Sequence, residues 1–329
     1  MGSLPRTWLV TGGAGFIGSH VATRLAEVGR PVRVVDNLST GSLANLAHLD
    51  GRVDFIEGDL CDERTCARAV EGVEVVFHVA ALPSVPRSLA DPWGSHNANV
   101  NATVRLLQAA RGAGVRRVVF SSSSSVYGDT AMLPKVEDVE PLPRSPYAAS
   151  KLSAEQYVLA YARAGLVEAV ALRYFNVFGP RQSPDSPYAA VIPLFFHAAV
   201  TGTPATVFGD GGQTRDFTYV ANVVDANLLA ATAPAERASG YPVNVGAGDR
   251  TSINELLELI EQVTGRSIAR EHRPPRPGDV RDSLAGLQRA ADRIGYRPEV
   301  AIGDGLRRTW EWFDAREAAV TAAPAPPRR

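Results

Sequence analysis

A glycine-rich turn between a short apolar strand and a helix limits the fold of this chain more than any other feature. The predicted strand covers residues 7–11, and Gly12-Gly13-Ala14-Gly15-Phe16-Ile17-Gly18 follows it directly. Glycines at this spacing allow a tight turn and a close approach of the backbone to a pyrophosphate, while the helix start supplies N–H donors. Because the motif has the strand-turn-helix context that it needs, we predict a dinucleotide site. Its predicted contacts here are Gly12, Gly15, Phe16, Ile17 and Gly18.

Strand and helix patterns alternate through the first half of the chain. Apolar strands separated by helices are typical of an α/β fold with a doubly wound, parallel Rossmann sheet that is covered on both faces. The predicted strands are 31–36, 53–56, 73–80, 117–120 and 169–173, and the predicted helices are 17–28, 97–111 and 148–164.

The pattern changes after Phe178 and predicts a second, smaller, mixed α/β substrate domain. Helices are expected at 191–200 and 252–264, the latter with Ser252 and Glu255 as a capping box, and a strand at 204–208. The proline-rich residues 270–278 are expected to be irregular. The predicted domains are residues 1–175 plus about 218–247 for the cofactor and about 176–217 plus 248–314 for the substrate. Residues 315–329 are expected to form a flexible tail.

Polar and small residues at strand ends refine the predicted cofactor. Asp36 ends the second strand, eighteen residues after Gly18, where a carboxylate accepts hydrogen bonds from ribose hydroxyls and repels a 2′-phosphate. The cofactor is therefore predicted to be NAD and not NADP. Further predicted contacts follow the second, third and fourth strands: Asn37, Asp59, Leu60, Ala80 and Ala81.

Tyr147 and Lys151 lie four residues apart, on one face of a predicted helix. An ammonium beside a phenol favours the phenolate and lowers its pKa. Such a pair is common and has little meaning alone. Behind a dinucleotide motif, it predicts a proton-transfer group.

These motifs together resemble the extended short-chain dehydrogenase/reductases, and within them the nucleotide-sugar epimerases of the UDP-glucose and UDP-N-acetylglucosamine 4-epimerase group. The resemblance runs from about residue 7 to 312. It is specific for the family and weakly specific for the sugar. The segments that carry it are the glycine turn, Ser121-Ser122-Ser123-Ser124-Ser125-Val126-Tyr127-Gly128, Ser145-Pro146-Tyr147 with Lys151, 172–181, 208–217 and 276–280.

The resemblance implies roles for individual residues. Ser123 matches the hydroxyl that hydrogen-bonds the sugar O4, Tyr147 matches the general base, and Lys151 matches the residue that binds the nicotinamide ribose. Asn99 and Tyr174 match cofactor-pocket residues, and Asn176 and Val191 are expected at the substrate. Arg215 and Arg276 match two arginines that grip the UDP pyrophosphate, which suits the bidentate binding of phosphate by guanidinium groups.

The implied reaction is inversion at C4 of a UDP-sugar through a transient 4-keto sugar, with bound NAD unchanged at the end. Dehydratases of this superfamily carry an Asp-Glu pair after the catalytic hydroxyl. Ser124 and Ser125 stand there and cannot serve as acid and base. A decarboxylase matches less well, and a non-catalytic NAD-binding regulator would usually lack the Tyr or the Lys.

The sugar stays open between glucose, N-acetylglucosamine and glucuronate. Ser283 is small where UDP-glucose-only epimerases often place a Tyr, which leaves room for a 2-N-acetyl group. Ser84, Arg87 and Ser124 are expected near the sugar, where hydroxyls and a cation would suit a C6 carboxylate.

The composition limits which binding partners and which cellular location are expected. A net charge of −1 gives no reason to expect nucleic acid or an anionic membrane, and no apolar run approaches the roughly 20 residues that span a bilayer. Two cysteines, Cys61 and Cys66, are expected to stay as thiols, which suits a cytoplasmic location. By resemblance, helices 97–111 and 148–164 are expected to form a four-helix interface in a homodimer.

Overall fold

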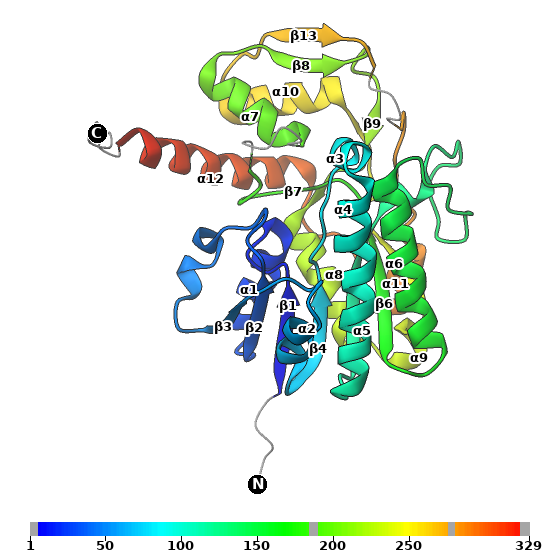
Figure 1. Cartoon of the computed structure of the whole chain (residues 1–329). Helices are drawn as coiled ribbons and strands as arrows, with labels where there is room; N and C mark the ends of the chain where they lie inside the picture. The colour runs from blue at the N-terminus through cyan, green and yellow to red at the C-terminus, as the bar shows by residue number, and fades with distance from the viewer. Residues whose placement is uncertain (1–5, 184–189, 276–279, 323–329) are drawn as a thin grey trace.

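A computed structural model describes residues 6–183, 190–275 and 280–322 of the chain. Its centre is a seven-stranded sheet in which every neighbouring pair is parallel, in the order β11-β6-β5-β4-β1-β2-β3 (Figure 1). The predicted doubly wound α/β fold is therefore confirmed. The strands are β1 (Thr7–Thr11), β2 (Val32–Asp36), β3 (Val53–Glu57), β4 (Val73–His78), β5 (Arg117–Ser123), β6 (Glu168–Tyr174) and β11 (Pro242–Val245).

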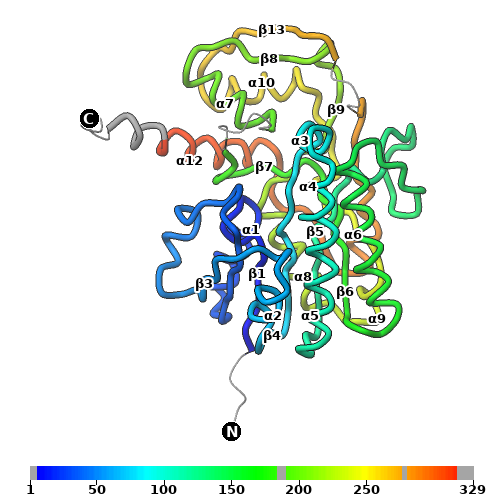
Figure 2. Tube along the Cα trace, viewed as in Figure 1, coloured from blue at the N-terminus to red at the C-terminus, as the bar shows by residue number. Residues whose placement is uncertain are grey.

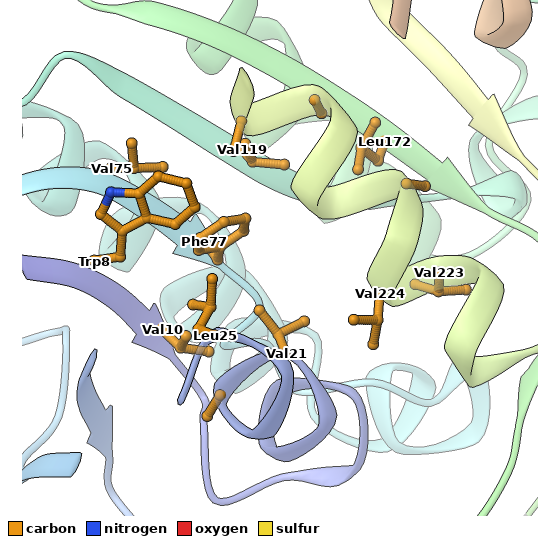
Figure 3. Close-up of a cluster of buried hydrophobic side chains, with 14 of the residues drawn as sticks. Trp8, Val10, Val21, Leu25, Val75, Phe77, Val119, Leu172, Val223 and Val224 are labelled. Atoms are coloured by element: carbon orange, nitrogen blue, oxygen red, sulfur yellow. The ribbon is translucent and has the colours of Figure 1, made fainter. Parts of the chain in front are cut away.

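Helices cover both faces of the sheet because strand side chains alternate between two apolar cores. Trp8 and Val10 of β1 join one core, while Leu9 between them joins the other. Figure 3 shows the first core, where Val21 and Leu25 face the sheet beside Val223 and Val224. The first face carries α1 (Phe16–Glu27), α8 (Val220–Thr232) and α11 (Gln288–Ile294), and the second carries α2 (Glu63–Val70), α5 (Ala102–Gly112) and α6 (Pro146–Arg163).

The direction of strand order reverses between β1 and β4. Chain crossovers leave the sheet on opposite sides there, which opens a crevice at the carboxyl ends of the strands. Gly12, at the end of β1, and Ala80, just beyond β4, come together at this point. The fold thus fixes where a ligand can bind.

A smaller unit lies above the carboxyl edge of the sheet (Figure 2). Apolar residues of three helices and one strand form the core of this unit. Phe195, Val207, Leu257 and Phe313 are among them. The predicted capping box is confirmed, with Ser252 and Glu255 bonded reciprocally. The elements are α7 (Val191–Thr201), β8 (Ala205–Phe208), β13 (Arg270–Arg273), α10 (Ile253–Thr264) and α12 (Ile302–Ala322).

Two expectations about the C-terminal half are corrected. Residues 270–273 were expected to be irregular but form β13, which pairs in parallel with β8, because the prolines begin only at Pro274. Residues 315–322 were assigned to a flexible tail but continue α12. Alanine, glutamate and arginine favour helix there, and the first proline follows at Pro324.

Several short elements were not predicted. The segment after β4 forms α3 (Val85–Ala90), which the Ser84 hydroxyl caps. A π-helical turn over Asn97–Asn101 joins α4 (Pro92–His96) to α5. The remaining elements are α9 (Ala235–Ala238), β7 (Val177–Phe178), β9 (Thr214–Arg215), β10 (Thr218–Tyr219), β12 (Thr251–Ser252) and 3-10 turns at Leu43–Asn45, Ala47–Leu49 and Ser124–Tyr127.

Both cysteines are free thiols, Cys66 buried and Cys61 half-buried. Within the described ranges, no helix is both long enough and apolar enough to cross a bilayer.

Candidate active site

A cleft of about 790 Å³ follows the carboxyl edge of the sheet, between the sheet and the smaller unit. Residues predicted from distant parts of the sequence meet in its wall. Those that line it are Gly12, Gly15, Phe16, Ile17, Gly18, Asp36, Asn37, Asp59, Leu60, Ala80, Ala81, Ser123, Ser124, Tyr147, Lys151, Tyr174, Asn176, Arg215 and Ser283.

The glycine turn is packed so closely that side chains would not fit. Gly12 has φ +64°, and a Cβ on it would lie 2.7 Å from the Cα of Ala80. A Cβ on Gly18 would collide with the carbonyl oxygen of Gly12. The backbone therefore forms the floor of the cleft, and among the described residues no side-chain hydrogen bond caps α1, which begins at Phe16.

Asp36 holds the edge of this turn. Its carboxylate accepts hydrogen bonds from the backbone N–H of Ala14 at 3.0 Å and of Leu38 at 2.8 Å. Beside it, the amide of Asn37 donates to Asp59 at 3.0 Å. Burial alone would raise the pKa of Asp59, but hydrogen bonds from Cys61 and Asn37 outweigh it and hold the pKa below its usual value. The cleft thus has an anionic end beyond β2 and β3.

The proton-transfer pair lies on the first turns of α6. The Ser145 hydroxyl caps this helix by accepting from the N–H of Ala148 at 3.1 Å, and Pro146 occupies the first turn. Burial raises the pKa of Tyr147, while a hydrogen bond with Ser123 acts in the opposite direction. The expected lowering of the Tyr147 pKa by Lys151 is not found, because removal from water dominates for both groups.

Lys151 is buried, and its ammonium lies 4.6 Å from the ring centroid of Phe120. Burial lowers the pKa of Lys151 to about 7, and Glu155, one turn further along α6, opposes that shift. In the described part of the chain, the ammonium has no hydrogen-bond partner, although it lines the cleft. It is therefore available to bind a ligand hydroxyl.

Asn99 lies beside the cleft and not in its lining. Its amide donates to the Ser150 hydroxyl at 2.9 Å and its oxygen accepts from the N–H of Leu82 at 2.7 Å. It thereby ties the π-helical turn to α6 next to Lys151. Tyr174, in contrast, lines the cleft and is bonded to Ser121 and Asn227, and burial raises its pKa to about 12.

Two residues expected at the sugar lie elsewhere. The Ser84 hydroxyl caps α3 by accepting from the N–H of Arg87, and neither side chain is part of the cleft lining. Ser84 has φ +118°, and Asn176, which does line the cleft, has φ +23°. Strained backbone of this kind gathers at binding sites, where surrounding contacts hold it in place.

A second hollow of about 240 Å³ adjoins the cleft and shares Asn176, Val177 and Arg215 with it. Val191 lines this hollow, with Phe208 and Phe217 among its apolar neighbours. The Arg215 guanidinium donates to the carbonyls of Thr214 and Arg281 at 2.9 and 3.0 Å. Arg276, its predicted companion, lies outside the described residues.

Sequence reasoning missed some residues of the lining, among them Ser125, Lys135, Arg144 and Gln182. Ser125 stands in the same serine run as Ser123, and Arg144 immediately precedes the cap of α6, so proximity to a motif was a usable signal for both. Lys135 and Gln182 reach the cleft only through folding of long loops, and no pattern in the sequence indicates it.

NAD fits this arrangement. The side-chain-free turn at the start of α1 suits a pyrophosphate, and Asp36 lies where a ribose would meet it. The ammonium of Lys151, with no partner among the described residues, offers donors to the second ribose.

Comparisons with a family model and with individual proteins point to the same family. The sequence model of the NAD dependent epimerase/dehydratase family matches residues 8–246. UDP-glucose 4-epimerase of Mycolicibacterium smegmatis is 41% identical over 309 residues, which are 93% of this chain and 97% of that protein.

Solved structures agree. UDP-N-acetylglucosamine 4-epimerase from Methanobrevibacter ruminantium, in complex with UDP-N-acetylmuramic acid, has a TM-score of 0.89 and 39% identity, covering 95% of this chain and 99% of its own. A variant of UDP-glucuronic acid 4-epimerase from Bacillus cereus, with NAD and a fluorinated UDP-sugar, has a TM-score of 0.87 and 30% identity, covering 94% and 99%.

Proposed function

The chain belongs to the NAD dependent epimerase/dehydratase family, and on that premise we propose that it inverts C4 of a UDP-sugar by transient oxidation with bound NAD. One observation carries the proposal. Ser123, Tyr147 and Lys151 line the same cleft as the glycine turn, so that a proton-transfer group faces a dinucleotide site.

Each of the three residues has a distinct task in the proposed reaction. When bound, NAD supplies a hydride acceptor and returns the hydride. Tyr147 takes the proton of the C4 hydroxyl and later gives it back. Ser123 hydrogen-bonds the same oxygen and Tyr147, which aligns them. Lys151 binds the cofactor ribose, and once charged it lowers the pKa of Tyr147 toward the range that a base needs.

We propose that the second hollow holds the nucleobase and that Arg215 binds the pyrophosphate with Arg276. The hollow is small and largely apolar, and Arg215 stands between it and the cleft. A UDP anchored there leaves the sugar free to turn, so that either face of C4 can be presented in the cleft.

The lining favours epimerisation over a dehydratase and over a non-catalytic NAD-binding protein. A dehydratase needs carboxylates beside the catalytic hydroxyl, but Ser124 and Ser125 line the cleft there. A non-catalytic NAD-binding protein has no need for Ser123, Tyr147 and Lys151 to converge. Neither alternative uses the arrangement as fully as C4 inversion does.

A substrate panel tests the proposal. Purified protein is incubated separately with UDP-galactose, UDP-N-acetylglucosamine and UDP-glucuronate, and products are identified by NMR. We expect the C4 epimer of at least one substrate, without added NAD. Absence of a C4 epimer from all three would refute the proposed activity.

We also propose a homodimer formed through the helices of one face. Helices α5 and α6 lie side by side there, with α4 beside them (Figure 1). Trp93 on α4 is 72% exposed, Leu89 on α3 is 62% exposed and Tyr157 on α6 is 48% exposed. Large apolar side chains gathered on one face support an interface. Light scattering should give twice the chain mass, and a monomeric mass would contradict the proposal.

The free thiols of Cys61 and Cys66 and the use of NAD support a cytoplasmic location, which we propose for the protein. Fractionation of cells should recover the protein with cytoplasmic markers.

A further inference from the structure

One wall of the cleft carries a guanidinium without a partner. Arg144 lines the cleft and is exposed, and in the described part of the chain it makes no hydrogen bond or ion pair. It stands three residues before Tyr147, next to the cap residue Ser145. Its stem lies against Gly128, where a Cβ would come within 3.2 Å of the Arg144 Cγ. A cation that lines the same cleft as Tyr147 and makes no ion pair among the described residues is suited to a ligand.

Hydroxyl groups lie on the same side of the cleft. Ser124 and Ser125 follow Ser123 in the turn that ends at Gly128, and both line the cleft. The Ser125 hydroxyl is shielded from solvent and, among the described residues, has no hydrogen-bond partner. A buried hydroxyl normally finds a partner, so this one has an unused capacity to donate. Ser283 also lines the cleft.

A second cationic residue, Lys135, also lines the cleft and contacts the Gly128 segment. The Lys135 ammonium is buried and donates to the carbonyls of Gly128 and Thr130 at 3.4 and 3.2 Å. Burial lowers the pKa of Lys135, and the carboxylates of Asp129 and Asp282 oppose that shift. Within the described ranges Lys135 makes no ion pair, so the two carboxylates compensate it only at longer range. Gly128 therefore lies close to both Arg144 and Lys135.

We propose that Arg144 is a specificity residue that recognises a carboxylate on the sugar of the UDP-sugar substrate, with Ser125 as a second donor. This inference rests on the proposed function. A guanidinium offers two parallel N–H donors that match a carboxylate, and such charged hydrogen bonds are stronger than neutral ones. A neutral sugar gives Arg144 only hydroxyls to bind. The sequence pointed to Arg87 for this task, but the structure places Arg144 in the lining and Arg87 outside it.

The experiment compares acidic and neutral substrates in matched variants. Arg144→Gln removes the charge, and Arg144→Lys keeps the charge but loses the fork. Arg68→Gln is the control, because Arg68 is exposed in the last turn of α2, outside the cleft lining, and its loss changes the net charge equally. The kcat/KM for UDP-glucuronate and for UDP-glucose is measured for each, at low and at high salt, after melting curves have shown that each is folded.

We expect the wild type to prefer UDP-glucuronate. Arg144→Gln should lower the ratio of kcat/KM for UDP-glucuronate over UDP-glucose by about 10- to 100-fold, the range for loss of a hydrogen bond to a charged group. Arg144→Lys should give a ratio between those of the wild type and Arg144→Gln, and Arg68→Gln should keep the wild-type ratio. Binding of UDP-N-acetylmuramate, which carries its carboxylate on another substituent, shows by calorimetry whether the carboxylate must be at C6.

The outcomes separate this inference from the proposed function. If both sugars are epimerised and Arg144→Gln leaves their ratio unchanged, the role of Arg144 is overturned and the epimerase stands. If neither sugar is epimerised but UDP-glucuronate binds more tightly than UDP-glucose, and Arg144→Gln removes that difference, the epimerase fails and the recognition of the carboxylate stands. A wild type that prefers UDP-glucose in both rate and binding overturns the inference.

Discussion

The two ends of the cleft are built in different ways. At the cofactor end, the lining comes from residues that directly follow β1 to β4, and the glycines after β1 leave no room for side chains there. At the sugar end, it comes from side chains of segments far apart in the chain, including Ser124, Arg144, Asn176 and Ser283. The first end follows from the rules of the parallel sheet, whereas the second depends on how loops return to it.

The two ends should therefore differ in how they tolerate substitutions. A site made of backbone tolerates almost no substitution, and its loss removes the cofactor together with all chemistry. A site made of loop side chains can change one residue at a time and shift selectivity while the reaction survives. The following predictions examine that contrast, from the largest expected effect to the smallest.

Gly18→Ala should abolish retention of NAD. The added methyl group would collide with the carbonyl oxygen of Gly12, and the turn that suits the pyrophosphate would open. NAD released by denaturing the purified variant measures the effect. Gly112→Ala is the matched control, because no atom lies within 4 Å of a Cβ at this position at the end of α5. Equal NAD content in both variants would show that backbone packing does not govern the cofactor end.

Tyr147→Phe should reduce kcat by about 100- to 10,000-fold, the usual range for loss of a general acid-base group. UDP binding, measured by calorimetry, should change little, because the phenol is remote from Arg215 in the proposed arrangement. Tyr157→Phe, on the exposed side of the same helix, serves as the control. Full activity of Tyr147→Phe would refute the role assigned to the phenol.

Ser283→Tyr should act on selectivity alone. The Ser283 side chain is small and buried at the sugar end, so a Tyr ring would fill the space that a 2-N-acetyl group needs. We expect kcat/KM for UDP-N-acetylglucosamine to fall at least about 10-fold relative to UDP-glucose. Ser283→Ala should keep the wild-type ratio. A proportional loss with both sugars would mean that the two ends of the cleft are not separable.

His78→Gln should change how the free energy of unfolding depends on pH in the acid range, with a smaller effect on it at neutral pH. His78 ends β4 and joins Thr11 of β1 to Thr103 of α5 through hydrogen bonds of 2.8 and 2.9 Å. Burial lowers its pKa to about 3 from 6.5, so the unfolded chain binds a proton below pH 6.5 that the folded chain does not bind. His78 should therefore cost the fold up to about 1.4 kcal/mol per pH unit as the pH falls from 6.5 to 5.

Urea unfolding at each pH measures this slope, which should be shallower in His78→Gln. His197→Gln, at an exposed position of α7, should keep the wild-type slope. Identical slopes in all three proteins would show that burial does not hold His78 neutral in the folded chain.

The same contrast separates the features that could be predicted from the sequence from those that could not. Gly12 to Gly18, Asp36 and the strand pattern are local signals whose meaning is set by the sheet, and the fold and the family are confirmed. The strand β13 was missed because its four residues, Arg270–Arg273, are polar and exposed, and their order depends on pairing with β8. Propensity could not reveal a partner so far away in the chain.

The sugar end shows most clearly what could not be predicted from the sequence. Arg87 was expected near the substrate because a cation there would suit a C6 carboxylate, yet Ser84 starts a short helix that leaves Arg87 outside the lining. Arg144 was not singled out, although it directly precedes the Ser-Pro-Tyr motif. Whether an arginine lines a cleft depends on tertiary packing, here the close approach of Gly128, which no local pattern reports.

The most direct test of the central claim follows one atom. The UDP-sugar that the panel identifies as substrate is prepared with deuterium at C4, and the product is examined by NMR and mass spectrometry. The account predicts an inverted C4 that keeps its deuterium, with no label in solvent and no free NADH. Release of a 4-keto sugar with free NADH, or an inverted product that has lost the label, would contradict reversible oxidation at C4 by a retained cofactor.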